Sequence, residues 1–136
     1  MNNSNDINKL LQEAIACHQS GKLEQAERLY RKILGKQHNH FETLFLLGAL
    51  SSNIGKKDLA VTLLKEAILI RPDHAEAHNN LAIAFLSKGN LNAAVKSFKN
   101  AVIFDPEYVE AHFNLGIALQ QSGELDEAVK SFKSVV

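Results

Sequence analysis

The chain has a single cysteine, Cys17, so it cannot form a disulfide within itself. Disulfides are the usual stabilising device of small secreted domains, and their absence favours a reducing compartment. The first six residues also lack the basic and apolar regions of a signal peptide. We therefore expect a soluble, cytoplasmic protein.

The chain also has a formal net charge of zero and no long apolar run. Fifteen lysines and arginines balance fifteen aspartates and glutamates, and no run of one sign disturbs that balance locally. Nucleic acid is not an expected partner, because phosphate binding needs clustered positive charge. A membrane is not expected either, since no apolar stretch approaches the roughly 20 residues that span a bilayer. The length of 136 residues predicts one folding unit.

The motifs of common enzymes are absent. The sequence has no glycine-rich phosphate loop, no nucleophile elbow and no His-Glu-x-x-His run. His38 with His40, and His74 with His78, have spacings that suggest a metal site only weakly. We interpret these histidines as turn and packing residues. The sequence thus predicts no catalytic residue, no metal and no cofactor.

Glycine is scarce, but four of the seven glycines are evenly spaced. Gly21, Gly55, Gly89 and Gly123 follow one another at intervals of 34 residues, and so do the two prolines, Pro72 and Pro106. Three further sets share the interval: Ala26, Ala60, Ala94 and Ala128; Ala14, Gly48, Ala82 and Gly116; and the bulky Tyr30, Leu64, Phe98 and Phe132. A fixed period of this size indicates a stacked repeat.

This period divides the chain, after a polar tail at residues 1–6, into repeats 7–40, 41–74, 75–108 and an incomplete 109–136. Apolar residues recur three or four apart in both halves of each repeat, which predicts two amphipathic helices joined at the glycine. First helices are expected at 6–20, 41–54, 75–88 and 109–122, and second helices at 22–34, 56–69, 90–103 and 124–136. Asn5 or Asp6 would cap the first helix.

The fourth repeat carries a recognisable set of residues: Leu115, Gly116, Gly123, Ala128 and Phe132. On this set the chain resembles the tetratricopeptide repeat family over residues 7–136. The first repeat departs from the pattern, with Glu13 where the others have leucine, which is typical of an end repeat. The resemblance implies an all-α fold, a right-handed superhelical solenoid of antiparallel helix hairpins whose first helices line a concave groove.

The resemblance also assigns residues to that groove. Asn80 and Asn114 share one repeat position, and a side-chain amide both donates and accepts hydrogen bonds. They resemble the inward asparagines in the repeats of O-linked N-acetylglucosamine transferase, although both could instead bond within their helix pair. Apolar side chains at Leu11, Ile15, Phe45, Ile83, Phe113 and Ile117 would be exposed anchors, unless neighbouring helices bury them. The candidate peptide-binding residues are Asn80, Asn114, Phe45, Phe113, Asn79, Ile83, Ile117 and Gln121.

The function that this pattern predicts is a protein-protein interaction scaffold that binds a peptide or helix in its concave groove. Two alternatives stay open. Because the sequence stops inside the second helix of the fourth repeat, the array could be the N-terminal targeting or substrate-recognition arm of a larger glycosyltransferase, sulfotransferase or methyltransferase. The repeats could also self-assemble as a homo-oligomer through uncapped ends.

Overall fold

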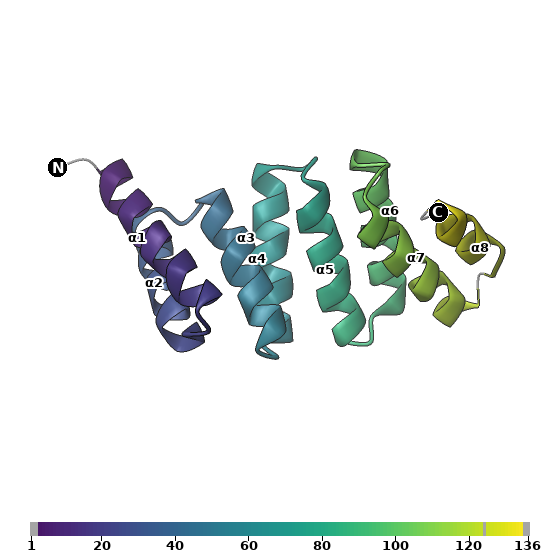
Figure 1. Ribbon diagram of the computed structural model, residues 1–136, viewed down its shortest axis with the longest axis horizontal. Helices are drawn as coiled ribbons and strands as arrows, with labels where there is room; N and C mark the ends of the chain where they lie inside the picture. Colours follow the sequence, from purple (N-terminus) through teal and green to yellow (C-terminus); the bar gives the residue numbers. More distant parts are fainter. Residues whose placement is uncertain (1–2, 124, 135–136) are drawn as a thin grey trace. The chain divides into compact units, whose positions relative to one another are not determined.

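A computed structural model describes residues 3–123 and 125–134, without the side chains of residues 3, 125, 126 and 128. Within these residues the fold is all-α, as the sequence predicts, with eight helices and no strand. Their bounds are α1 Asn3–Gln19, α2 Leu23–Lys36, α3 Phe41–Asn53, α4 Lys57–Ile70, α5 Ala75–Ser87, α6 Leu91–Phe104, α7 Val109–Ser122 and α8 Leu125–Lys133. Consecutive helices pair as antiparallel hairpins (Figure 1).

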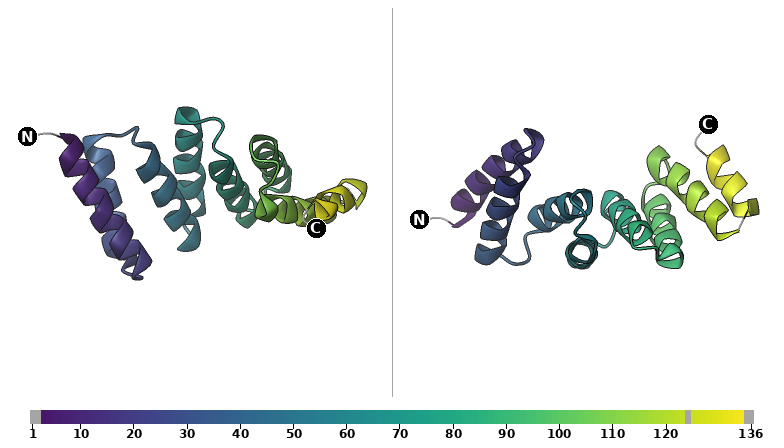
Figure 2. Two further views of the ribbon diagram at one scale, coloured as in Figure 1. Left: turned by 45° about the horizontal axis from the view of Figure 1, so that its top comes forward. Right: turned by 90° about the horizontal axis from the view of Figure 1, so that it is seen from below.

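The contacts divide the chain into two compact units, Met1–Ile70 and Arg71–Val136, where the sequence predicts one. Unit 1 holds the hairpins α1–α2 and α3–α4, and unit 2 holds α5–α6 and α7–α8. Inside each unit the second helix of the first hairpin also packs on the first helix of the next. The right-hand view in Figure 2 shows the two helices of each hairpin side by side.

The turn inside each hairpin depends on its glycine. Gly21, Gly55, Gly89 and Gly123 all have positive φ angles, between 79° and 84°. A residue with a Cβ atom adopts this left-handed conformation at a cost, whereas glycine adopts it freely. The predicted helix-ending role of these glycines is confirmed.

The predicted helix bounds hold to within three residues at the ends that the structure describes, and the start of the chain needs a correction. Helix α1 already includes Asn3, so residues 3–6 are helical and do not form a tail. Asp6 lies in the first turn of α1 and Asn5 inside the helix, so neither is its cap. An aspartate in that turn still interacts favourably with the helix dipole.

The small and bulky positions of the repeat meet inside each hairpin. A Cβ atom added to Gly48 would lie 2.8 Å from Cγ of Leu64, and one added to Gly116 would lie 2.6 Å from Cε1 of Phe132. The bulky residue of the second helix therefore fills the space that the small residue of the first helix leaves. On the second helices Ala26, Ala60 and Ala94 are fully buried, and Ala128 lies outside the described side chains. The predicted architectural role of these positions is confirmed.

A polar contact joins the two hairpins of unit 1. Lys56, in the α3–α4 turn, donates to the Glu27 carboxylate of α2 at 2.9 Å, and Arg31 donates to the same carboxylate at 3.0 Å. These two hydrogen bonds lower the pKa of Glu27. The stability that they contribute is therefore present above the ordinary carboxylate pKa and is lost as the pH falls through the lowered value.

Candidate protein-binding surface

Asn80 and Asn114 lie on the two first helices of unit 2, α5 and α7, and both side chains are half-buried. The two helices are neighbours at this level, because Nδ2 of Asn114 donates to Oδ1 of Asn79 at 3.5 Å. The side chain of Asn80 makes no hydrogen bond to another described residue. Part of each predicted amide therefore remains accessible on adjacent helices.

Asn79 has a different role from the one that the sequence predicts. Its side chain is fully buried, donates from Nδ2 to the Tyr108 hydroxyl at 3.4 Å, and accepts from Asn114. A buried amide needs such partners, because an unpaired polar group in the interior costs about 1–3 kcal/mol. The prediction that Asn79 contacts a ligand is wrong, since α7 covers it.

Phe113 is the most exposed of the predicted apolar anchors. Its side chain is 48% exposed, although its ring meets Phe132 edge to face at a centroid distance of 5.8 Å. Ile83 and Ile117 are half-buried, and Ile83 packs on the core of unit 2. Gln121 is exposed near the end of α7. The first helices of unit 2 thus carry apolar and amide groups that remain open in part.

Leu11 and Phe45, the unit 1 residues at the repeat position of Phe113, are less exposed than Phe113. Phe45 is half-buried and stacks on Phe41 at 5.9 Å with nearly parallel rings. Leu11 is buried in the core that includes Phe41 and Leu44, so for this residue the alternative of burial by neighbouring helices holds. Ile15 is half-buried and packs on the same core. Among the predicted groove residues, the most exposed aromatic side chain therefore lies in unit 2.

The histidines serve local structure. His74 caps α5 by accepting from the backbone N–H of Ala77 at 3.1 Å, and Nε2 of His78 donates to the carbonyl of Pro72 at 2.7 Å. His78 is also buried, which confirms its interpretation as a packing residue. Among the described residues no three His, Cys, Asp or Glu side chains cluster as metal ligands would. None of the described helices combines the length and apolar character needed to cross a membrane.

Both tyrosines of the chain should titrate at unusually high pH. Burial raises the pKa of Tyr30 and of Tyr108 to about 12, and for Tyr108 the carboxylates of Glu110 and Glu76 add to the rise. We expect the absorbance at 295 nm to show no tyrosinate step near pH 10 in the folded protein and a full step there in denaturant. The stability linked to these protons is complete below pH 10 and is lost as the pH rises toward 12. A half-amplitude step near pH 10 in the folded protein would show that one hydroxyl is exposed.

Comparison with known families agrees with this architecture. A profile described as TPR repeat matches residues 83–123. Three profiles described as tetratricopeptide repeat match residues 10–32, 41–74 and 111–136. The chain belongs to the tetratricopeptide repeat family.

Solved structures of MamA are similar to this chain over nearly its whole length. A crystal structure of MamA is 25% identical with a TM-score of 0.91, and the match covers 97% of this chain and 77% of that one. The MamA fragment 41-end from Desulfovibrio magneticus RS-1 is 27% identical with a TM-score of 0.90, covering 96% of this chain and 74% of that one. No curated protein sequence matches.

One enzyme is also similar. The Thermobaculum terrenum O-GlcNAc transferase mutant K341M is 31% identical with a TM-score of 0.82, over 88% of this chain and 23% of that enzyme. The likeness to the repeats of this enzyme is confirmed, but it spans less than a quarter of the enzyme's length. The tetratricopeptide repeats and the MamA-like neighbours support a protein-interaction scaffold and do not favour the two alternatives.

Proposed function

We propose that unit 2 binds an extended segment of a partner protein along α5 and α7, through the amides of Asn80 and Asn114, and that the chain works by binding and not by catalysis. The observation that carries the proposal is the recurrence of a partly exposed amide at one repeat position on two adjacent helices. No cofactor, nucleic acid or membrane takes part.

The chemistry of the surface suits a peptide backbone. An extended segment has an unpaired N–H and C=O at each residue, and a carboxamide can donate to one and accept from the other. Ile83, Ile117 and Phe113 lie on the same two helices and would remove water from apolar side chains of the segment. The candidate binding residues that remain after the structure is considered are Asn80, Ile83, Phe113, Asn114, Ile117 and Gln121.

The proposal predicts that the double substitution Asn80→Ala, Asn114→Ala weakens peptide binding about 10- to 100-fold, because it removes two or more net hydrogen bonds of about 0.5–1.5 kcal/mol each. A displayed peptide library is first selected against the parent protein. The Kd of the selected peptide is then measured by calorimetry for the parent and the variant.

The matched control is Asn92→Ala, Asn100→Ala, which removes the same two groups from α6, a second helix. We expect the control to bind within about twofold of the parent. Equal affinity of the parent and the Asn80, Asn114 variant would remove the amide pair from the binding site.

A further inference from the structure

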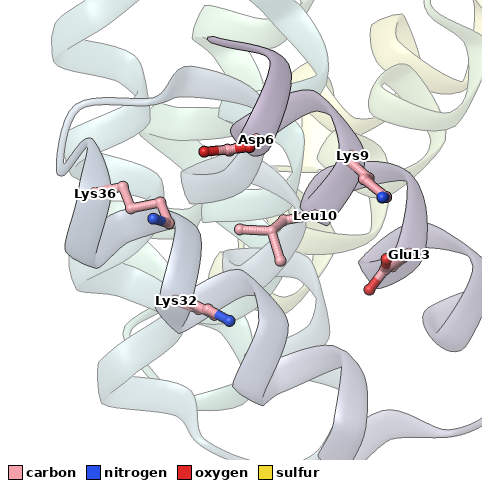
Figure 3. Close-up of a pocket in the computed structure, with 6 residues that line it drawn as sticks. All are labelled: Asp6, Lys9, Leu10, Glu13, Lys32 and Lys36. Carbon is pink, nitrogen blue, oxygen red and sulfur yellow. The ribbon is translucent and has the colours of Figure 1, made fainter. Parts of the chain in front are cut away.

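A hollow recurs at the same repeat position in both hairpins of unit 1. In the first hairpin it has a volume of about 210 Å³ and is lined by Asp6, Lys9, Leu10, Glu13, Lys32 and Lys36 (Figure 3). In the second it has a volume of about 280 Å³ and is lined by His38, Asn39, Leu44, Glu66, Leu69 and Ile70. Three pairs of lining residues are separated by one 34-residue period: Leu10 and Leu44, Lys32 and Glu66, and Lys36 and Ile70. The two hollows therefore lie at equivalent positions of the first two repeats.

The third hairpin fills this position with its own side chains. His78 and Phe104 follow Leu44 and Ile70 by one period, and their rings stack at a centroid distance of 5.2 Å. The bond from His78 to the Pro72 carbonyl holds one of these rings in place. In the second hairpin neither position carries a ring, and both residues line the hollow, Leu44 buried at its base and Ile70 partly exposed.

The first two hollows differ in their rims. Figure 3 shows Lys32 and Lys36 of α2 on one side of Leu10, and Lys9 and Glu13 of α1 on the other, so charged groups surround a single apolar side chain. In the second hairpin Leu69 is 81% exposed and Ile70 is 41% exposed. The carboxylate of Glu66 takes the place of Lys32 there. The second hollow is thus apolar with an acidic rim.

We infer that the hollow of the second hairpin binds an aromatic side chain of a partner protein that has a lysine or arginine next to it in sequence. In the third hairpin two rings occupy these repeat positions themselves, so this part of the repeat accommodates groups of that size. Burying such a ring against Leu69 and Ile70 removes apolar surface from water, and Glu66 attracts a neighbouring cation. The first hollow sets three lysines against the two carboxylates of Asp6 and Glu13, so its net charge is positive and does not attract that cation. Because this site lies in unit 1, it is independent of the α5–α7 surface.

The test is a titration of the ¹⁵N-labelled protein with the blocked dipeptide acetyl-Phe-Lys-amide. We expect saturable shifts of the backbone amides of His38, Asn39, Glu66, Leu69 and Ile70. The first hollow is an internal control and should show no shifts. Acetyl-Phe-Glu-amide and acetyl-Leu-Lys-amide should each bind at least about threefold more weakly, through loss of the charge pair and of the ring respectively.

Two variants sharpen the test. The pair Leu44→His, Ile70→Phe gives the second hairpin the rings of the third, and we expect it to weaken dipeptide binding at least about tenfold. Leu69→Ala changes only an exposed side chain, so the fold is retained, and binding should weaken about threefold or more. Its matched control, Ile103→Ala at the equivalent position of the third hairpin, should bind as the parent does. Absence of saturable shifts in the parent, or unchanged binding by Leu69→Ala, would overturn the proposal.

Discussion

Replacing Phe98 by alanine should lower the free energy of unfolding of unit 2 by about 3–5 kcal/mol, the range for truncating a buried phenylalanine. Phe98 is fully buried on α6 and belongs to the core that α5 and α7 share through Ala82 and Leu115. Urea denaturation followed by circular dichroism measures the change. Hydrogen exchange locates the destabilised region, because the backbone amides of α5, α6 and α7 should lose protection from exchange first.

Phe104→Ala is the matched control, since it truncates the same side chain on the same helix. Phe104 is 46% exposed and contacts His78, so the substitution should cost about 1 kcal/mol. Equal losses for the two variants would contradict the assignment of Phe98 as the bulky core residue of its repeat.

Replacing Ala94 by leucine is the second large effect, an expected loss of about 1–3 kcal/mol from overpacking. Ala94 is fully buried where the two helices of the hairpin approach closely, so three additional carbon atoms must displace α5 or α6. Thermal and urea unfolding measure the loss. Ala16→Leu, on the exposed face of α1, should change stability by less than about 0.5 kcal/mol. If the Ala94 variant melted with the parent, close helix contact at this position would be disproved.

The hairpins could be predicted because their signals are local. The glycine at each turn, the prolines beyond α4 and α6 and the spacing of apolar residues act within a few positions of the backbone that they determine. The small and bulky positions could be read for a different reason. The same contact between a small residue of the first helix and a bulky residue of the second recurs along the chain. Its two members therefore both recur every 34 residues, and this interval indicates the contact as well as the helices.

The binding surface could be predicted only in part, because exposure depends on residues far along the chain. Asn79 shares its repeat position with Phe45 and Phe113, yet only Asn79 is fully buried. Its partner Tyr108 lies 29 residues away, and no pattern within α5 indicates it. The burial of Leu11 could not be decided from the sequence for a similar reason, since Phe41 and Leu44 of the next hairpin belong to the core around it.

The hollow of the second hairpin has a signal in the sequence, but this signal is visible only when two repeats are aligned. His78 and Phe104 of the third repeat stand 34 residues after Leu44 and Ile70 of the second. Aligning the two repeats therefore shows that the second has aliphatic side chains where the third has two rings. The alignment alone does not show that His78 and Phe104 face each other, because they lie on different helices. The stacking distance in the third hairpin supplies that information.

Binding of a partner protein along the first helices of unit 2 is tested by mapping the library-selected peptide onto the ¹⁵N-labelled chain through the chemical shifts of its backbone amides. We expect the largest shifts to cluster on α5 and α7, around Asn80, Ile83, Asn114 and Ile117. Shifts confined to α6 and α8, with those four amides unchanged, would contradict it.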